Sequence, residues 1–87
     1  MSSALQIFYT HFDAAFFELP PQLQARVESK IDQMGLGLST FPHHRLAASN
    51  RFRLRVGDYH VIYTFDTANN VIHLLAIGHR RAIYRAL

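Results

Sequence analysis

The sequence predicts one α+β domain over residues 1–87, in which a small antiparallel sheet packs on an N-terminal helical hairpin in the order β-α-α-β-β-β. Three observations predict this fold. A short β-prone run opens the chain, two segments with helical periodicity follow, and three β-prone runs separated by turn residues complete it. With 87 residues, 7 Phe and 4 Tyr, the chain is long enough for one hydrophobic core and too short for two domains.

The first half of the chain contains the expected first strand and both helices. Residues 5–10 (LQIFYT) place apolar side chains at alternate positions, as a strand does. A short helix is expected over residues 12–19, because Pro20-Pro21 follows and a residue before proline disfavours the helical conformation. A second helix should pack antiparallel to the first and run from residue 21 or 22 to Met34, where Gly35 ends it. Its apolar stripe consists of Leu23, Val27, Ile31 and Met34.

The second half of the chain contains the other three expected strands. Residues 35–50 (GLGLSTFPHHRLAASN) are rich in small and turn-forming residues, so they are expected to form a loop. Strands should follow at about residues 51–56, 59–65 and 70–77. Gly57-Asp58 suits a two-residue type II′ turn, which needs glycine at its first central position. After Gly78 the chain ends in a basic tail (HRRAIYRAL) with room for one helical turn.

Positive charge is concentrated in the second half of the chain. Residues 1–44 hold Arg26 and Lys30 against four acidic residues, a net charge of −2. Residues 45–87 hold seven arginines against two aspartates, a net charge of +5. The net positive charge of this half of the chain indicates an anionic partner, either nucleic acid or an acidic protein segment. Solubility alone is the alternative explanation for the same charges.

Several classes of protein are excluded by what the sequence lacks. Without cysteine there is neither a disulfide nor a thiolate metal site. No run reaches the roughly 20 apolar residues of a membrane helix, and the N-terminus has no signal-peptide pattern. His11 and the adjacent His43 and His44 do not have the spacing of metal ligands. We therefore expect a soluble cytoplasmic protein with no metal, no cofactor and no membrane partner.

A two-residue turn at Gly57-Asp58 determines which residues face each other across the hairpin. The face toward the helices receives three apolar pairs, which are Val56 with Tyr59, Leu54 with Val61, and Phe52 with Tyr63. The opposite face receives Arg55 with His60, Arg53 with Ile62, and Arg51 with Thr64. Arginines two residues apart lie roughly 6.6–6.8 Å from each other, close to the spacing of phosphates along one nucleic-acid strand. The alternative is a solvated strand face that discourages aggregation.

Histidine is the residue type in this basic region that has acid/base chemistry near neutral pH. Arginine binds phosphate well, but a pKa above about 12 makes it a poor base. His60 and His79 are therefore the acid/base candidates, and Tyr84 is suited to stack on a base or donate a hydrogen bond. The alternative for each histidine is an ordinary half-buried position in a sheet. Arg80 reaches the same face if the last strand is central and Gly78 does not change its phase.

Three segments carry a resemblance to a known family. The run RLRVGDYHVIYTFD and the later run VIHLLAIGHRRAIYR resemble the RelE/ParE superfamily of toxins from bacterial type II toxin–antitoxin pairs. The upstream segment FELPPQLQARVESKI resembles that family's helical hairpin, so the likeness spans about residues 5–85. The resemblance implies a RelE-like fold, a small sheet packed on a helical hairpin, which agrees with the predicted order. It also implies a cognate antitoxin protein that wraps the toxin and neutralises its arginines.

The resemblance also implies an activity and a set of residues. RelE-like members cut mRNA on the ribosome with basic residues of the sheet and a C-terminal tyrosine, and thereby inhibit translation. By motif position the catalytic candidates are His60, Arg80, Tyr84 and Arg53. The candidates for contact with RNA or antitoxin are Arg51, Arg53, Arg55, Arg45, His79, Arg81 and Arg85.

The sequence departs from the RelE pattern at two places. Arg51 and Arg53 replace the typical lysines, and His60 replaces the usual arginine of the GDYR motif. The first change removes a base, whereas His60 supplies one. ParE-like members share the framework but poison DNA gyrase without a nuclease site. A metal-independent endoribonuclease acting on ribosome and mRNA is the leading interpretation. Gyrase inhibition, or a degenerate member that only binds its antitoxin, remains the alternative.

Overall fold

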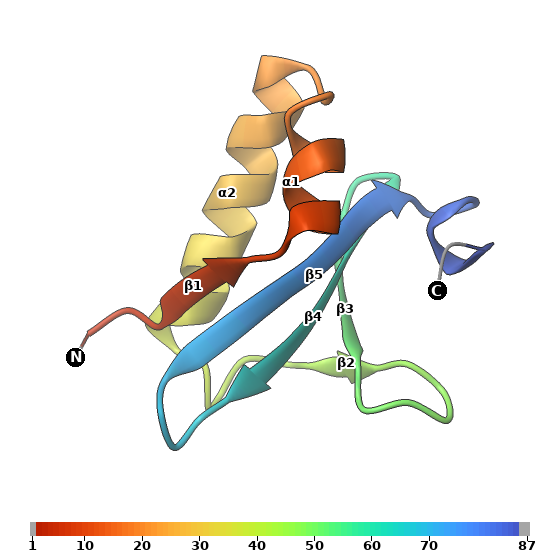
Figure 1. The fold of residues 1–87 in the computed structure, drawn as a ribbon. Helices are drawn as coiled ribbons and strands as arrows, with labels where there is room; N and C mark the ends of the chain where they lie inside the picture. The colour runs from red at the N-terminus through yellow and green to blue at the C-terminus, as the bar shows by residue number, and fades with distance from the viewer. Residues whose placement is uncertain (1, 86–87) are drawn as a thin grey trace.

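The computed structural model describes residues 2–85, apart from the side chain of Arg85. Its elements are β1 (Leu5–Phe8), α1 (Thr10–Phe16), α2 (Pro21–Leu36), β2 (His44–Arg45), β3 (Phe52–Val56), β4 (Tyr59–Asp66), β5 (Val71–His79) and the 3₁₀ turn η1 (Ile83–Arg85). Figure 1 shows α1 and α2 side by side on one side of the sheet, with η1 beyond the tip of β5. The predicted α+β class is confirmed, and the predicted element order is confirmed apart from the additional short strand β2. None of the helices in the described part is long and apolar enough to cross a membrane.

The sheet has five strands in the order β1-β5-β4-β3-β2, so β4 is central. β4 is antiparallel to both neighbours, whereas β1 runs parallel to β5, which makes the sheet mixed. The prediction of a purely antiparallel sheet was therefore wrong at β1. The direction of β1 depends on how the helical hairpin carries the chain across the sheet. No local sequence pattern records that long-range constraint.

The helical hairpin forms largely where the periodicity predicts it. Val27, Ile31 and Met34 are buried along α2, which confirms the apolar stripe. The prediction that Gly35 ends the helix was wrong, because α2 continues to Leu36. Gly35 instead lies against the N-terminal segment, where its carbonyl oxygen accepts a hydrogen bond of 3.0 Å from the amide of Ala4. A Cβ added at Gly35 would lie 3.6 Å from the Ala4 amide nitrogen, which is an ordinary contact, so this hydrogen bond and not the lack of a side chain joins the helix end to the N-terminal segment.

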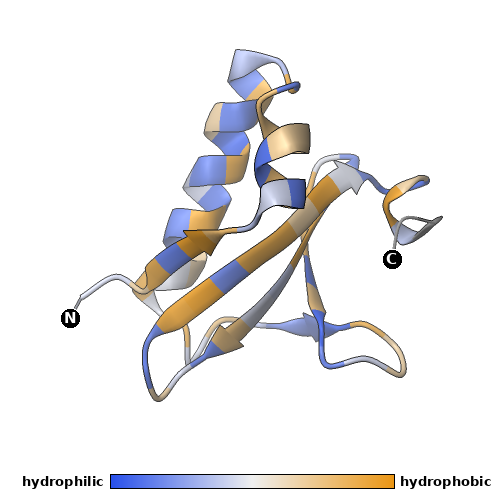
Figure 2. Ribbon diagram, viewed as in Figure 1, coloured by the Kyte–Doolittle hydropathy of each residue, from blue (hydrophilic) through white to orange (hydrophobic). Residues whose placement is uncertain are grey.

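The core lies between the helices and one face of the sheet. Figure 2 shows hydrophobic residues along most of β1 and β5, while α2 is mostly hydrophilic with narrower hydrophobic bands. The largest fully buried side chains of the core include Tyr63, Phe12, Ile31, Met34, Ile72 and Leu74. These residues come from both layers, so burial of this shared apolar surface holds the helices on the sheet.

The β3–β4 hairpin has the predicted register. Val56 pairs with Tyr59 and Arg55 with His60, and the three pairs beyond them also agree. Gly57 has φ +60, and Asp58 does not have a positive φ, as a type II′ turn requires. The pair of Arg51 with Thr64 does not form, because β3 begins only at Phe52.

The segment predicted as a loop over residues 35–50 contains a strand. His44 and Arg45 form β2, in which His44 pairs with Arg53 and Arg45 with Phe52. A strand of two residues is too short to show an alternating pattern, and only the neighbouring strand identifies it. The irregularity of β5 also lies elsewhere than at Gly78, which pairs normally with His60. The register shifts between Ile62 and Tyr63, whose partners are Ala76 and Leu74.

The turn conformation leads to a stability prediction. We expect Gly57→Ala to lower the free energy of unfolding by about 1–2 kcal/mol, because a Cβ disfavours a positive φ. Asp58→Ala, at the adjacent and exposed turn position, is the control and should change it by no more than about 0.5 kcal/mol. Urea unfolding of both variants measures the difference. Equal effects of the two substitutions would contradict the turn described here.

Candidate functional site

The candidate site lies on the sheet face that the helices do not cover. Along β3, Leu54 and Val56 are buried while Arg53 and Arg55 are exposed, because successive side chains of a strand point to opposite faces. His60 pairs with Arg55 and therefore shares their face. We call the surface formed by Arg53, Arg55, His60 and Arg80 the arginine face.

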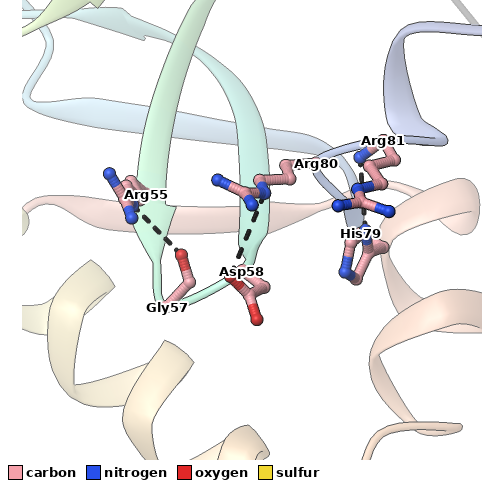
Figure 3. Close-up of polar contacts among 6 residues, drawn as sticks. All are labelled: Arg55, Gly57, Asp58, His79, Arg80 and Arg81. Carbon is pink, nitrogen blue, oxygen red and sulfur yellow. Dashed lines mark hydrogen bonds and ion pairs between the residues drawn. The ribbon is translucent and has the colours of Figure 1, made fainter.

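Arg80 is held beside the hairpin by the turn itself. Its backbone amide donates a hydrogen bond of 2.8 Å to the carbonyl oxygen of Asp58. Figure 3 shows its side chain over the same turn, with Nε 3.9 Å from Asp58 Oδ1, while Arg55 Nε donates to the Gly57 carbonyl oxygen at 3.1 Å. The exposed ion pair contributes little to stability. The backbone bond is what fixes the end of β5 near Arg55.

His60 is buried at the centre of the arginine face, with 7% of its surface exposed. The C-terminal turn covers it. Ile83 packs over Gly78, where an added Cβ would lie 3.1 Å from Ile83 Cδ1. The Tyr84 hydroxyl lies 2.6 Å from His60 Nδ1, a hydrogen bond whose donor depends on the tautomer of the imidazole. The absence of a side chain at Gly78 therefore lets η1 approach His60 closely.

The electrostatic environment favours the neutral form of His60. Burial lowers the pKa of His60 below its ordinary value, and the charges of Arg53, Arg55 and Arg80 lower this pKa further. A neutral imidazole has one nitrogen free to accept a proton. The arrangement combines a base, a hydroxyl and three fixed cations within one small surface.

Other predicted site residues lie around or away from this centre. Arg51 and Tyr84 line an open hollow of about 450 Å³ together with Leu46, Ala47 and Ser49. Arg81 is exposed in the turn after β5. The side chain of Arg85 lies outside the described part of the structure.

Two predicted residues are not brought to the arginine face. Arg45 pairs with Phe52, so the register directs it toward the helix side of the sheet. His79 pairs with Tyr59, also on the helix side, and its ring lies 5.6 Å from that of Tyr59. Its Nδ1 accepts a hydrogen bond of 3.2 Å from the amide of Arg81, as Figure 3 shows. The structure therefore leaves His60 as the histidine next to Arg55.

Sequence reasoning missed His44, which is exposed and pairs with Arg53 on the arginine face. Its neighbour His43 is structural. His43 Nε2 donates to the carbonyl oxygen of Leu38 at 2.7 Å, and Nδ1 lies 2.6 Å from the Tyr63 hydroxyl. Its ring also stacks on Phe65 at a centroid distance of 3.8 Å. Because His43 and His44 are adjacent in a segment that was expected to be a loop, the sequence did not indicate that His43 is structural and His44 lies on the arginine face. Within residues 2–85, no three acidic or histidine side chains gather to hold a metal ion.

Comparison with known families identifies the chain. The family model described as "ParE toxin of type II toxin-antitoxin system, parDE" matches residues 2–84. The chain belongs to the RelE/ParE superfamily of toxins from type II toxin–antitoxin systems. No curated protein matches this toxin.

RelE toxins are among the solved structures with the same fold. The toxin in the RelBE2 complex of Mycobacterium tuberculosis has a TM-score of 0.74 and 21% identity, over 91% of this chain and 100% of that one. The toxin of the Pyrococcus horikoshii RelE–RelB complex has a TM-score of 0.71 and 22% identity, over 91% of this chain and 97% of that one. A mutant of Escherichia coli RelE in the free state has a TM-score of 0.78 and 9% identity, over 95% of this chain and 90% of that one. At these identities the likeness shows the RelE-like fold.

The surroundings of His60 lead to a titration prediction. By NMR we expect the pKa of His60 to lie below about 6.5, and Arg53→Gln to raise it, because loss of a nearby cation favours imidazolium. Arg45→Gln is the control, since Arg45 lies on the other side of the sheet, and it should leave this pKa unchanged.

The same shift predicts how stability depends on pH. Between the folded pKa and about 6.5 the unfolded chain holds more protons at His60 than the folded chain does. The contribution of His60 to the free energy of unfolding should therefore rise with pH across this window and stay constant above it. A His60 pKa at or above 6.5 would contradict the described site.

Proposed function

We propose that this toxin is a ribosome-dependent mRNA endoribonuclease that uses His60 as its general base. The observation that carries the proposal is the position of His60, which is hydrogen-bonded to Tyr84 and surrounded by Arg53, Arg55 and Arg80. Cleavage of RNA by internal attack needs a base for the 2′-hydroxyl and positive charge around the phosphorus. This group of side chains has both, and the reaction requires no metal or cofactor.

In the proposed reaction each side chain has one role. The active tautomer of His60 donates Nδ1–H to the Tyr84 hydroxyl oxygen, which leaves the lone pair of Nε2 to accept the 2′-hydroxyl proton. The 2′-oxygen then forms a bond to phosphorus as the bond to the 5′-oxygen breaks, which gives a 2′,3′-cyclic phosphate. The 5′-oxygen takes a proton from the Tyr84 hydroxyl or from water. The arginines stabilise the charge that develops on the phosphate oxygens.

The burial of His60 is consistent with activity on the ribosome rather than on free RNA. Only 7% of its surface is exposed beneath Ile83 and Tyr84, so an RNA strand reaches Nε2 only after the C-terminal turn shifts. Contacts with a large partner are a suitable source of free energy for that shift.

We also propose a cognate antitoxin as the protein partner. The similar structures from M. tuberculosis and P. horikoshii, and one from E. coli, are complexes of a toxin with its antitoxin. The arginine face carries Arg53, Arg55 and Arg80, so acidic antitoxin side chains are its natural complement. Covering this face would block RNA.

Inhibition of DNA gyrase is the second candidate function. The observation that favours it is the matching family model, which is that of ParE toxins. In this alternative the arginine face binds protein, and His60 supplies shape and a hydrogen bond rather than a base.

Substitution of His60 separates the two functions. We expect His60→Ala to reduce ribosomal mRNA cleavage by about 10²- to 10⁴-fold and to abolish toxicity, while antitoxin binding persists. His60→Arg is the matched variant that keeps a donor and a charge but has no usable base. If His60→Arg is as active as the wild type, His60 is not the base. If His60→Ala still kills cells with intact mRNA and broken chromosomes, the gyrase alternative holds.

Charge reversal tests the antitoxin interface. We expect Arg53→Glu with Arg55→Glu to weaken the toxin–antitoxin complex by about 2–5 kcal/mol and to make its affinity less dependent on salt, because desolvated charge pairs are lost. Calorimetry at two salt concentrations measures both effects. Lys30→Glu, at an exposed position of α2, serves as the control. Unchanged affinity and salt dependence would show that the antitoxin binds elsewhere.

A further inference from the structure

The segment between β2 and β3 forms an open hollow together with the C-terminal turn η1. The hollow has a volume of about 450 Å³ and is lined by Leu46, Ala47, Ser49, Arg51 and Tyr84. The first four residues connect β2 to β3, and Tyr84 belongs to η1. Both segments lie on the right in Figure 1. The reaction proposed above uses Tyr84 but leaves the rest of the hollow without a role.

Tyr84 joins the hollow to the proposed catalytic centre. Its hydroxyl lies 2.6 Å from His60 Nδ1, and Tyr84 is also 41% exposed where it lines the hollow. A group that binds in the hollow therefore lies next to the residue that contacts the proposed base. The nucleotide beside the cleaved bond is the part of the substrate that reaches this place.

Arg51 joins the hollow to the arginine face. The amide of Leu46 donates a hydrogen bond of 2.9 Å to the carbonyl oxygen of Arg51, which continues the β2–β3 pairing by one step. Because side chains alternate along paired strands, Arg51 follows Arg53 on the same side of the chain. An RNA strand whose phosphates contact Arg53 and Arg55 therefore has its next nucleotide at the hollow.

The wall formed by the β2–β3 connection is held in shape by its own contacts. Ala48 has φ +54, which reverses the chain, and the amide of Arg51 donates a hydrogen bond of 3.0 Å to Ser49 Oγ. The Ser49 hydroxyl keeps its own O–H for a further hydrogen bond. A site that is formed before its ligand binds loses less free energy in ordering.

The lining of the hollow suits a flat aromatic ligand. Leu46 and Ala47 are apolar, and Tyr84 and Arg51 provide an aromatic ring and a planar guanidinium, the two kinds of group on which unpaired RNA bases stack. Ser49 and Arg51 add polar groups that can contact the edge of the base. An apolar surface with a few polar groups is typical of small-ligand sites.

The polar groups of the hollow favour one kind of base edge. The guanidinium of Arg51 has only hydrogen-bond donors, and the free O–H of Ser49 is also a donor. Among the described residues that line the hollow there is no carboxylate. Guanine and uracil present a keto oxygen, which accepts these hydrogen bonds, whereas adenine and cytosine present an amino group in the same place. An amino group would leave donors facing each other without an acceptor, which is unfavourable.

We propose that this hollow binds the base of a nucleotide next to the cleaved bond and selects guanine or uracil over adenine or cytosine. Arg51 and Ser49 then determine the sequence preference of the toxin, and Tyr84 stacks on the selected base. The proposal rests on the nuclease activity proposed above and names a specificity site for that activity. A base held in the hollow also fixes its ribose relative to His60, so the selection appears in kcat/KM.

The first test changes single groups of the substrate. Cuts made by the wild-type toxin in mRNA on purified ribosomes are mapped, and the nucleotides that flank the cut are then replaced by guanosine, inosine or adenosine in turn. Inosine keeps the keto oxygen and N7 of guanosine but lacks its 2-amino group. At one of the flanking positions we expect inosine to match guanosine, and adenosine to lower kcat/KM at least about tenfold.

The second test changes the hollow. Arg51→Lys keeps the charge but loses the planar pair of donors, so we expect the guanosine-to-adenosine ratio of kcat/KM to fall at least about fivefold. Arg45→Lys is the matched control, because Arg45 lies on the helix side of the sheet, and it should leave the ratio unchanged. Without ribosomes, guanosine monophosphate should shift the amide NMR signals of Ser49 and Arg51 more than adenosine monophosphate does.

Two outcomes would overturn the proposal. One is equal cleavage with guanosine, inosine and adenosine at every position that flanks the cut. The other is a preference that persists unchanged in Arg51→Lys, which would assign the selection to the ribosome. Failure of the nuclease proposal looks different, because no mRNA would then be cut with any substrate while the two nucleotides still shift the signals of Ser49 and Arg51 unequally.

Discussion

The register of the β3–β4 hairpin determines which side chains of the sheet are buried against the helices and which form the arginine face. Gly57, with its positive φ, allows a two-residue turn, and that turn sets every cross-strand pair. Because side chains alternate along a strand, a slip of one residue would move Leu54 and Val56 to solvent and Arg53 and Arg55 into the core. The cost of burying two unpaired arginines excludes the slipped register. The same constraint that builds the core therefore also assembles the arginine face.

The sheet separates two surfaces of opposite character. On one side, Arg53, Arg55 and Arg80 surround a buried histidine, and on the other side an apolar groove has an acidic rim. The terminal turn links the first surface to the end of the chain, because Ile83 packs over Gly78 and Tyr84 reaches His60. Access to His60 therefore depends on the position of the 3₁₀ turn η1. The cationic face and the groove with its acidic rim therefore attract groups of opposite charge.

Local patterns were sufficient for the features that repeat along the chain. The apolar stripe of α2 and the alternation of β3 predicted two layers, and the Gly-Asp turn predicted the register that places His60 opposite Arg55. Burial is the larger cause of the lowered pKa of His60, and the arginines on the same face of the sheet lower it further.

Features that depend on contacts between distant segments could not be predicted. The two-residue strand β2 exists only because β3 lies beside it, so the position of His44 next to Arg53 had no local signal. The parallel pairing of β1 depends on how the helices cross the sheet, and the continuation of α2 through Gly35 depends on its contact with Ala4. For the same reason the cover of Ile83 over Gly78 was not foreseen.

In the proposed reaction a neutral His60 accepts the 2′-hydroxyl proton, and this proton transfer starts RNA cleavage. The most direct measurement is the single-turnover rate of mRNA cleavage on purified ribosomes between about pH 5 and pH 8. We expect a rate that rises with pH and reaches a plateau after an inflection below about 6.5, since burial and three arginines lower the pKa of His60. A rate that does not change over this range would contradict it.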